Sequence, residues 1–102
     1  MSQSLHKLAI KKLKEKLIDD GYEYCKENFE IFTSDGRGLI DLACFKREDG
    51  EVRAVAYECE TNKSENNKQF QKNKRDLSAF KRMFSNSKVC VRDLVSATSS
   101  CD

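Results

Sequence analysis

Acidic residues in two apolar segments are the part of this sequence that could do chemistry. Glu58 and Glu60 end the segment VRAVAYECE (52–60), and Asp41 lies within the apolar segment LIDLACFK (39–46). A carboxylate among apolar neighbours is costly unless a partner stabilises its charge. Carboxylate oxygens suit hard divalent cations, Mg²⁺ first and Mn²⁺ next, with waters completing the shell. If these acids converge, they predict a metal site.

A tight turn between the two segments decides whether the acids converge. The dipeptide Asp-Gly at 49–50 favours a two-residue type I′ hairpin. Asp41 then lies opposite Glu58, with Cβ atoms about 5 Å apart, and Glu60 points to the same face. A three-residue loop with a glycine bulge would instead turn Asp41 and Glu58 to opposite faces. Each acid taken alone is ordinary for a solvated strand end, so it is their combination that indicates a site.

Hydrophobic periodicity predicts the elements that must position these acids. Apolar residues at three- and four-residue steps predict a helix over 4–20, capped by Ser4 and ended by Gly21. The aromatic segment 22–33 is typical of a strand or of two short extended pieces. The hairpin described above follows in the sequence.

The second half of the chain returns to a helical period. Apolar residues on one face predict a second helix over 64–84, capped by Ser64. KVCVRDL (88–94) is typical of a final strand, and residues 95–102 are expected to form a frayed, flexible tail. The predicted order is therefore helix, strand, strand, strand, helix, strand.

The two hairpin strands are apolar on both faces, which predicts a layer of cover on each side. One face carries Leu42, Cys44, Val55 and Tyr57, and the other carries Ala43, Phe45, Ala54 and Ala56. The two helices can supply this cover, and the final strand can join in parallel by a right-handed crossover. We expect an α/β fold of order αβββαβ, with a mixed central sheet flanked by helices on both faces.

Length and composition limit the class of protein. The chain has 102 residues, of which 35% are charged and 38% are hydrophobic. This predicts one globular domain over 1–102, with a core at about 4–94. No segment approaches the ~20 apolar residues of a membrane span, and the N-terminus lacks the apolar core of a signal peptide. We therefore expect an intracellular, soluble protein.

The cysteine pattern argues against a metal–thiolate site. The chain has five cysteines, an odd number, spread without any CxxC pair. Cys44 and Cys59 lie in strand-like segments, where a thiol usually acts as a small apolar residue. A disulfide remains an alternative if the source is a hyperthermophile.

Basic residues cluster in both predicted helices, although the net charge is only +2. The first group is Lys7, Lys11, Lys12, Lys14 and Lys16, and the second is Lys68, Lys72, Lys74 and Arg75. Such clusters are either solvated helix faces or a nucleic-acid surface, and charge alone does not distinguish the two.

These features together resemble the PD-(D/E)XK nuclease superfamily, which includes restriction endonucleases and archaeal Holliday-junction resolvases. The order of elements agrees over about 4–94, and the local matches are GLID (38–41) and ECE (58–60). The resemblance implies that Asp41 and Glu58 hold Mg²⁺ or Mn²⁺, helped by the backbone carbonyl of Cys59.

One position departs from the family pattern. Glu60 stands where most members have lysine, although some similar restriction enzymes also carry Glu there. The resemblance therefore leaves the role of positioning or deprotonating the nucleophile to Glu60 or to Lys63. Many relatives also place a Glu on the first helix near the site. That position here is Ile10, and His6 lies one helical turn earlier, so His6 is a further candidate.

The resemblance also gives the second basic cluster a role. Gln69 and Gln71 are placed as similar glutamines are in resolvase-like relatives. The residues expected to contact DNA are Lys68, Gln69, Gln71, Lys72 and Arg75. The implied activity is hydrolysis of phosphodiester bonds in double-stranded or branched DNA, leaving 5′-phosphate ends, by recognition of DNA structure rather than sequence.

The closest comparison within the family is a small resolvase or a nuclease of a mobile element or virus. A homodimer is expected if both strands are cut. Two alternatives stay open at this point. One is a catalytically inactive, nuclease-like protein that binds nucleic acid, and the other is a small α/β interaction domain without a metal site.

Overall fold

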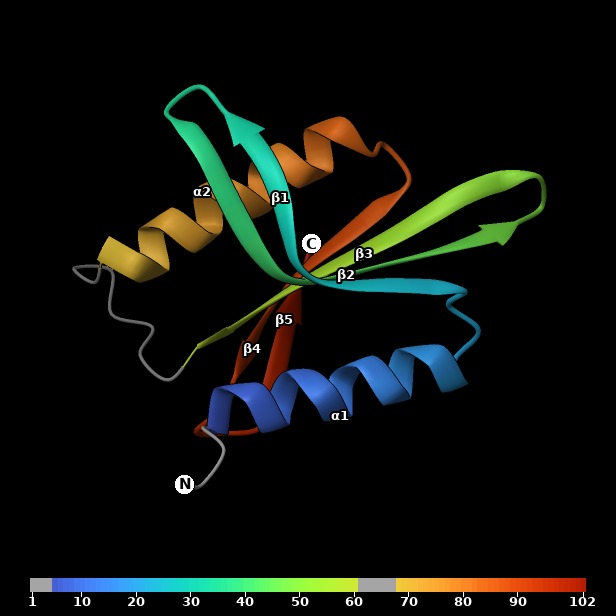
Figure 1. Cartoon of the computed structure of the whole chain (residues 1–102), viewed down its shortest axis with the longest axis horizontal. Coiled ribbons are helices and arrows are strands. Elements are labelled where there is room, and N and C mark those ends of the chain that lie inside the picture. The colour runs from blue at the N-terminus through green and yellow to red at the C-terminus, as the bar shows by residue number, and fades with distance from the viewer. Residues whose placement is uncertain (1–4, 61–67) are drawn as a thin grey trace.

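A mixed five-stranded sheet and two helices make up the fold in the computed structural model, which describes residues 5–60 and 68–102 (Figure 1). The elements are α1 (Leu5–Asp19), β1 (Tyr24–Thr33), β2 (Gly36–Glu48), β3 (Glu51–Glu60), α2 (Lys68–Met83), β4 (Ser87–Asp93) and β5 (Thr98–Cys101). The strands are ordered β1-β2-β3-β4-β5, with β3 and β4 parallel and the other neighbours antiparallel. The predicted α/β class, mixed sheet and parallel crossover are confirmed.

Helix α1 ends where the sequence predicts. Gly21 has a left-handed φ of 104°, and the N–H of Tyr22 donates to the Leu17 carbonyl at 3.0 Å. This is the hydrogen-bonded glycine stop typical of helix ends. Helix α2 is described from Lys68, and the predicted cap Ser64 lies outside the described residues. Neither helix in the described part is long and apolar enough to cross a membrane.

The β2–β3 hairpin has the predicted register. Asp49 and Gly50 both have positive φ, 55° and 80°, as a type I′ turn requires. Pairing runs from Glu48↔Glu51 at the turn to Leu42↔Tyr57. The alternative with a glycine bulge, which would have moved Asp41 and Glu58 to opposite faces, is excluded.

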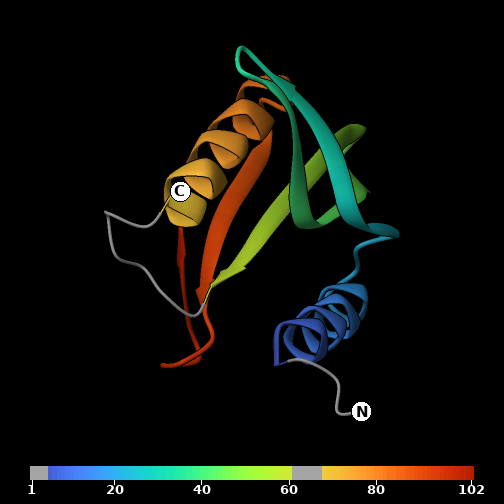
Figure 2. The same ribbon diagram turned by 60° about the vertical axis from the view of Figure 1, so that its left-hand side comes forward.

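Two separate apolar clusters fill the space between the sheet and the helices. Ile10 and Leu17 of α1 pack with one set of strand side chains, which includes Leu42, Cys44, Val55 and Tyr57. Leu77 and Phe80 of α2 pack with the alternate set, which includes Ala43, Phe45, Ala54 and Ala56. The predicted division of these eight side chains is confirmed. In Figure 2, α2 lies beside the upper part of the sheet, and α1 lies below it, apart from α2.

The regular alternation of β2 breaks at Asp41. Residues two apart in a strand share a face, yet Ile40 packs in the α2 cluster and Leu42 in the α1 cluster. On the neighbouring strand, Asn28 has a left-handed φ of 53° between the pairs Glu27↔Leu42 and Phe29↔Ile40. In Figure 1 the first part of β2 rises with β1 toward α2, while its second part runs out with β3 to the hairpin. Asp41 therefore lies where the sheet divides.

The C-terminal segment differs from the expected frayed tail. Residues Thr98–Cys101 form β5, which pairs antiparallel with β4, and a Cys90–Cys101 disulfide joins the two strands. The hydrogen bonds of this pairing and the covalent bridge together order a polar segment that has almost no apolar residues to bury. A strand of this composition has no hydrophobic alternation by which to predict it.

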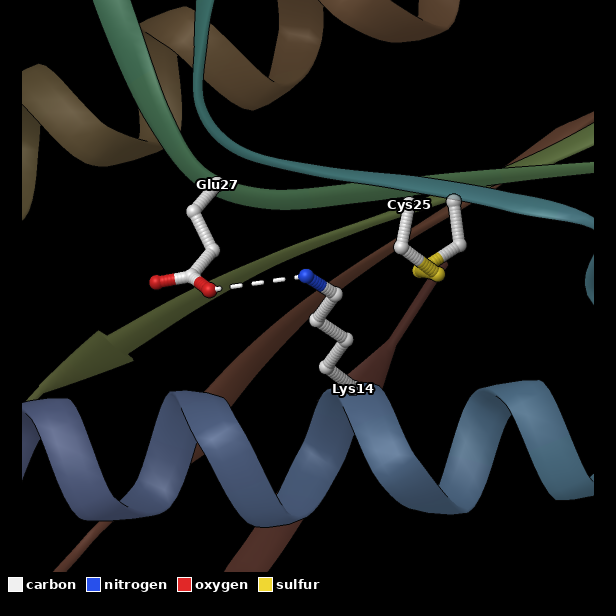
Figure 3. Close-up of a disulfide and its surroundings, with 4 residues drawn as sticks. Lys14, Cys25 and Glu27 are labelled. Carbon is white, nitrogen blue, oxygen red and sulfur yellow. Dashed lines mark ion pairs between the residues drawn. A yellow bond between two sulfur atoms is a disulfide. The ribbon is translucent and has the colours of Figure 1, made fainter.

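Cys44 is not the free apolar thiol expected from the sequence. It forms a disulfide with Cys25 on the adjacent strand (Figure 3), and the prediction for Cys44 was wrong because the β1–β2 register places these two residues directly opposite. Nearby, Lys14 of α1 lies 3.7 Å from Glu27 of β1. Cys59 is the only free cysteine in the described residues, and it is buried, as predicted.

Reduction of the disulfides should destabilise the protein. Each bridge restricts the unfolded chain, over sequence separations of 19 and 11 residues, and such bridges typically contribute about 2–4 kcal/mol. Thermal unfolding with and without a reductant measures the effect. The variant Cys90→Ser/Cys101→Ser lacks only the bridge that closes the shorter loop. Reductant should therefore still lower its melting temperature, but by less than it lowers that of the wild type. An unchanged melting temperature in reductant would contradict the prediction.

Candidate functional site

Asp41 and Glu58 meet where the backbone pairing of β2 and β3 ends. The N–H of Asp41 donates to Glu58 Oε1 at 2.7 Å, and the N–H of Cys59 donates to Asp41 Oδ2 at 2.8 Å. Each carboxylate therefore accepts a hydrogen bond from the backbone of the opposite strand. These two bonds take the place of the next backbone–backbone hydrogen bonds between β2 and β3. This reciprocal pair fixes both side chains at the point where the strands part.

His6 approaches the same carboxylate from the first turn of α1. Its Nε2 lies 3.1 Å from Asp41 Oδ2, the oxygen that also accepts the Cys59 N–H. The imidazole is 44% exposed, whereas the Asp41 side chain is 20% exposed. The structure thus brings together three of the residues selected from the sequence: His6, Asp41 and Glu58.

Glu58 is the most unusual group of the site. It is 1% exposed, and its Oε2 has no hydrogen-bond partner among the described residues. Burial, and next the negative charge of Asp41, raise the pKa of Glu58 to about 9, and the charge of Asp76 adds to the rise. At neutral pH this position therefore favours either a proton or a nearby cation.

Asp76 of α2 is a buried acid that the sequence analysis did not select. It is fully buried, its Oδ1 has no hydrogen-bond partner in the described part of the chain, and its Oδ2 lies 3.2 Å from Lys72 Nζ. Its carboxylate packs directly on Gly38, at the start of the GLID motif, where any Cβ would overlap it. Gly38 could therefore have indicated from the sequence that another group packs closely on this strand. It could not have indicated that the group is Asp76.

Glu60 also lies on the side of β3 that faces α2. It is 6% exposed, and its Oε1 accepts a hydrogen bond from Asn73 Nδ2 at 2.8 Å. Like Asp76, Asn73 was missed from the sequence, because a polar residue in the polar half of a helix gives no sign of being buried. Glu60 contacts α2 through Asn73, and the charge of Asp76 on α2 acts on Glu58, which agrees with the expectation that Glu58 and Glu60 share a face.

The Cys59 thiol is not suited to nucleophilic chemistry. Burial, followed by the charges of Asp41 and Glu58, raises the pKa of this thiol to about 12. Its backbone N–H is already used by Asp41. Lys63, the alternative catalytic lysine, lies outside the described residues.

The basic residues of α2 are only partly available for phosphate. Lys68 and Gln71 are exposed, and the side chain of Gln69 lies outside the described part of the structure. Lys72 contacts Asp76, and Arg75 Nη1 lies 2.8 Å from Asp35 Oδ2 in the β1–β2 turn. Two of the cations expected to bind DNA therefore already contact acids within the chain.

Neither the static geometry nor similarity assigns a function to this cluster. In residues 5–60 and 68–102, no three His, Cys, Asp or Glu side chains are close enough together to form a metal-binding group as they stand. Comparisons of the chain with known protein families, with curated proteins and with solved structures found no match. The proposals below therefore depend on the local chemistry of the cluster.

Gly38→Ala should destabilise the protein through its contact with Asp76. The added methyl group would overlap a fully buried carboxylate, and overpacking of this kind costs about 1–3 kcal/mol. Urea unfolding of Gly38→Ala, Asp76→Ala and the double variant gives a double-mutant cycle. The cost of Gly38→Ala should fall by at least about 1 kcal/mol in the Asp76→Ala background. Equal costs in both backgrounds would show that Asp76 is not the obstacle.

Proposed function

We propose that this chain is a metal-dependent deoxyribonuclease whose metal ligands are Asp41 and Glu58. The observation that carries the proposal is Glu58 itself, a buried carboxylate with one oxygen lacking a donor, beside a second carboxylate. Two such acids repel unless one is protonated or a cation lies between them. An oxygen-only pair of this kind fits Mg²⁺ or Mn²⁺.

The surrounding residues suit this chemistry. A cation held by Asp41 and Glu58, with the Cys59 carbonyl, would supply a water of lowered pKa and stabilise charge on the phosphate. His6 holds one oxygen of Asp41 and so orients that ligand. Glu60, whose Oε1 accepts a hydrogen bond from Asn73, and Lys63 are the two candidates that would orient or deprotonate the nucleophile.

The fold supports the same proposal at a coarser level. The elements α1 to β4 follow the order αβββαβ of the PD-(D/E)XK core, and the two apolar clusters agree with helices on both faces of the sheet. Strand β5 is an addition to that order. We infer DNA as the substrate, recognised by shape or branching, in an intracellular setting, with a homodimer if both strands are cut.

A second candidate is favoured by one observation, the presence of Glu60 where most members of the PD-(D/E)XK superfamily, which the sequence resembles, carry lysine. A nuclease-like protein that binds DNA without cutting it would share every other feature of the site. The third candidate is a small interaction domain without a metal site. It predicts that Mg²⁺ or Mn²⁺ leaves the melting temperature unchanged.

Incubation with supercoiled plasmid and branched DNA in Mg²⁺ or Mn²⁺ tests the proposal. Wild-type protein should nick or cut the DNA, whereas Asp41→Ala should not, because it removes both a ligand and the partner of the Cys59 N–H. Cleavage that survives Asp41→Ala would come from a contaminant and would end the claim. DNA binding without cleavage would favour the second candidate, a nuclease-like protein that binds DNA without cutting it.

A further inference from the structure

A hollow between α1 and the end of the sheet carries a second inference. It has a volume of about 300 Å³, at the small end of ligand pockets. Its apolar lining includes Leu5 and Leu8 of α1, which are 57% and 40% exposed, and Tyr57 of β3, which is half-buried. Exposed leucines beside a tyrosine form a surface suited to a flat apolar group.

Cations surround this apolar surface. Lys12 and Lys16 of α1 and Arg92 of β4 line the hollow, and no acid is among its lining residues. Within the described residues neither Lys12 nor Lys16 forms an ion pair, and Arg92 donates to the Ser99 hydroxyl at 3.2 Å. The hollow therefore combines positively charged side chains with an apolar floor.

The hollow adjoins the proposed catalytic cluster. Leu5 and Leu8 line the hollow, and the same first turn of α1 carries His6, which contacts Asp41. On α2, by contrast, Lys72 and Arg75 contact acids of the chain. A DNA strand leading away from the cluster would meet Lys12 and Lys16 of α1, which form no ion pair within the described residues.

We propose that this hollow binds one unpaired nucleotide of the DNA strand next to the bond that is cut. The phosphates would lie against Lys12, Lys16 and Arg92, and the base would lie on Tyr57 and the leucines. A base inside a duplex cannot enter a space of this size without first unpairing. The inference deepens the proposed function and depends on it: the preferred substrate is DNA with a single-stranded flap or branch.

Fluorescence anisotropy in EDTA, where no metal-dependent cleavage occurs, tests the inference. The probes are a labelled blunt duplex and the same duplex with a single-stranded flap. Wild-type protein should bind the flapped DNA at least about fivefold more tightly. Lys12→Gln/Lys16→Gln should lose roughly tenfold or more of this binding at 0.1 M salt, with a smaller salt slope, because two phosphate contacts are removed.

Lys81→Gln/Arg82→Gln is the matched control. It removes the same charge from exposed positions at the end of α2, and it should keep the preference for the flap. Equal affinity for flapped and blunt DNA, or equal losses in the two variants, would overturn the inference. Tyr57→Leu should weaken binding of the flap more than binding of the duplex, and the reverse result would also overturn it.

Cleavage, measured separately in Mg²⁺, keeps the two proposals distinguishable. Flap binding that depends on Lys12 and Lys16 without any cleavage would retain the hollow and end the nuclease proposal. Cleavage that depends on Asp41 but is insensitive to Lys12 and Lys16 would retain the nuclease proposal and end the proposal that the hollow binds a nucleotide.

Discussion

Replacement of Glu58 by glutamine should abolish Mg²⁺-dependent DNA cleavage without unfolding the protein. Glutamine keeps the shape of the side chain and an oxygen to accept the Asp41 N–H, but it removes the negative charge that a cation requires. Loss of a residue that merely supports a metal ligand typically costs 10- to 100-fold. Loss of the ligand itself should exceed about a hundredfold.

Glu23→Gln is the matched control for this experiment. It makes the same chemical change at an exposed position outside the candidate site, and it should cleave DNA at the wild-type rate. The comparison is made from initial rates of plasmid nicking in Mg²⁺ and in Mn²⁺. If Glu58→Gln cuts as fast as Glu23→Gln, Glu58 is not a metal ligand.

The second large effect concerns stability against pH. The pKa of Glu58 is about 9 in the folded protein, above its ordinary value of 4.5. Between these values the folded protein retains a proton that the unfolded chain has lost, so stability falls as pH rises. In EDTA, the free energy of unfolding should therefore decrease toward pH 9, by up to about 1.4 kcal/mol per pH unit from this group.

Glu58→Gln should remove this contribution. Relative to wild type, the variant should gain stability progressively from pH 5 to pH 9, because its amide has no proton to lose. Urea unfolding in EDTA at several pH values measures the difference, with Glu23→Gln expected to follow the wild type. Addition of Mg²⁺ should stabilise wild type most at high pH. If the difference in the free energy of unfolding between wild type and Glu58→Gln does not change with pH, Glu58 does not have a raised pKa.

Local rules were sufficient to predict the centre of the fold. The Asp-Gly turn at 49–50 set the register, which in turn placed Asp41 beside Glu58. The apolar character of both strand faces predicted the two clusters, and Gly21 marked the end of α1. In each case the information lay within a few residues of the feature.

The remaining features depend on contacts between distant segments. The burial of Asp76 and Asn73 follows from how α2 packs on β2 and β3, and a polar helical turn does not reveal it. The Cys25–Cys44 bridge needed the β1–β2 register, and the Asp-Gly dipeptide at 35–36 does not give it, because Gly36 already pairs with Thr33 instead of lying in the turn. The break at Asp41 could not be predicted because its neighbours on both sides are apolar. When the strand side chains switch faces there, the pattern of apolar residues does not change.

A crystal structure of wild-type protein grown with Mn²⁺ tests the central claim most directly. The anomalous signal of Mn²⁺ should appear as a peak within about 2.5 Å of carboxylate oxygens of both Asp41 and Glu58. The same peak should be absent from Glu58→Gln crystals grown in the same solution. A wild-type map with no peak between these two residues, or with Mn²⁺ bound elsewhere, would contradict the claim that they form a metal site.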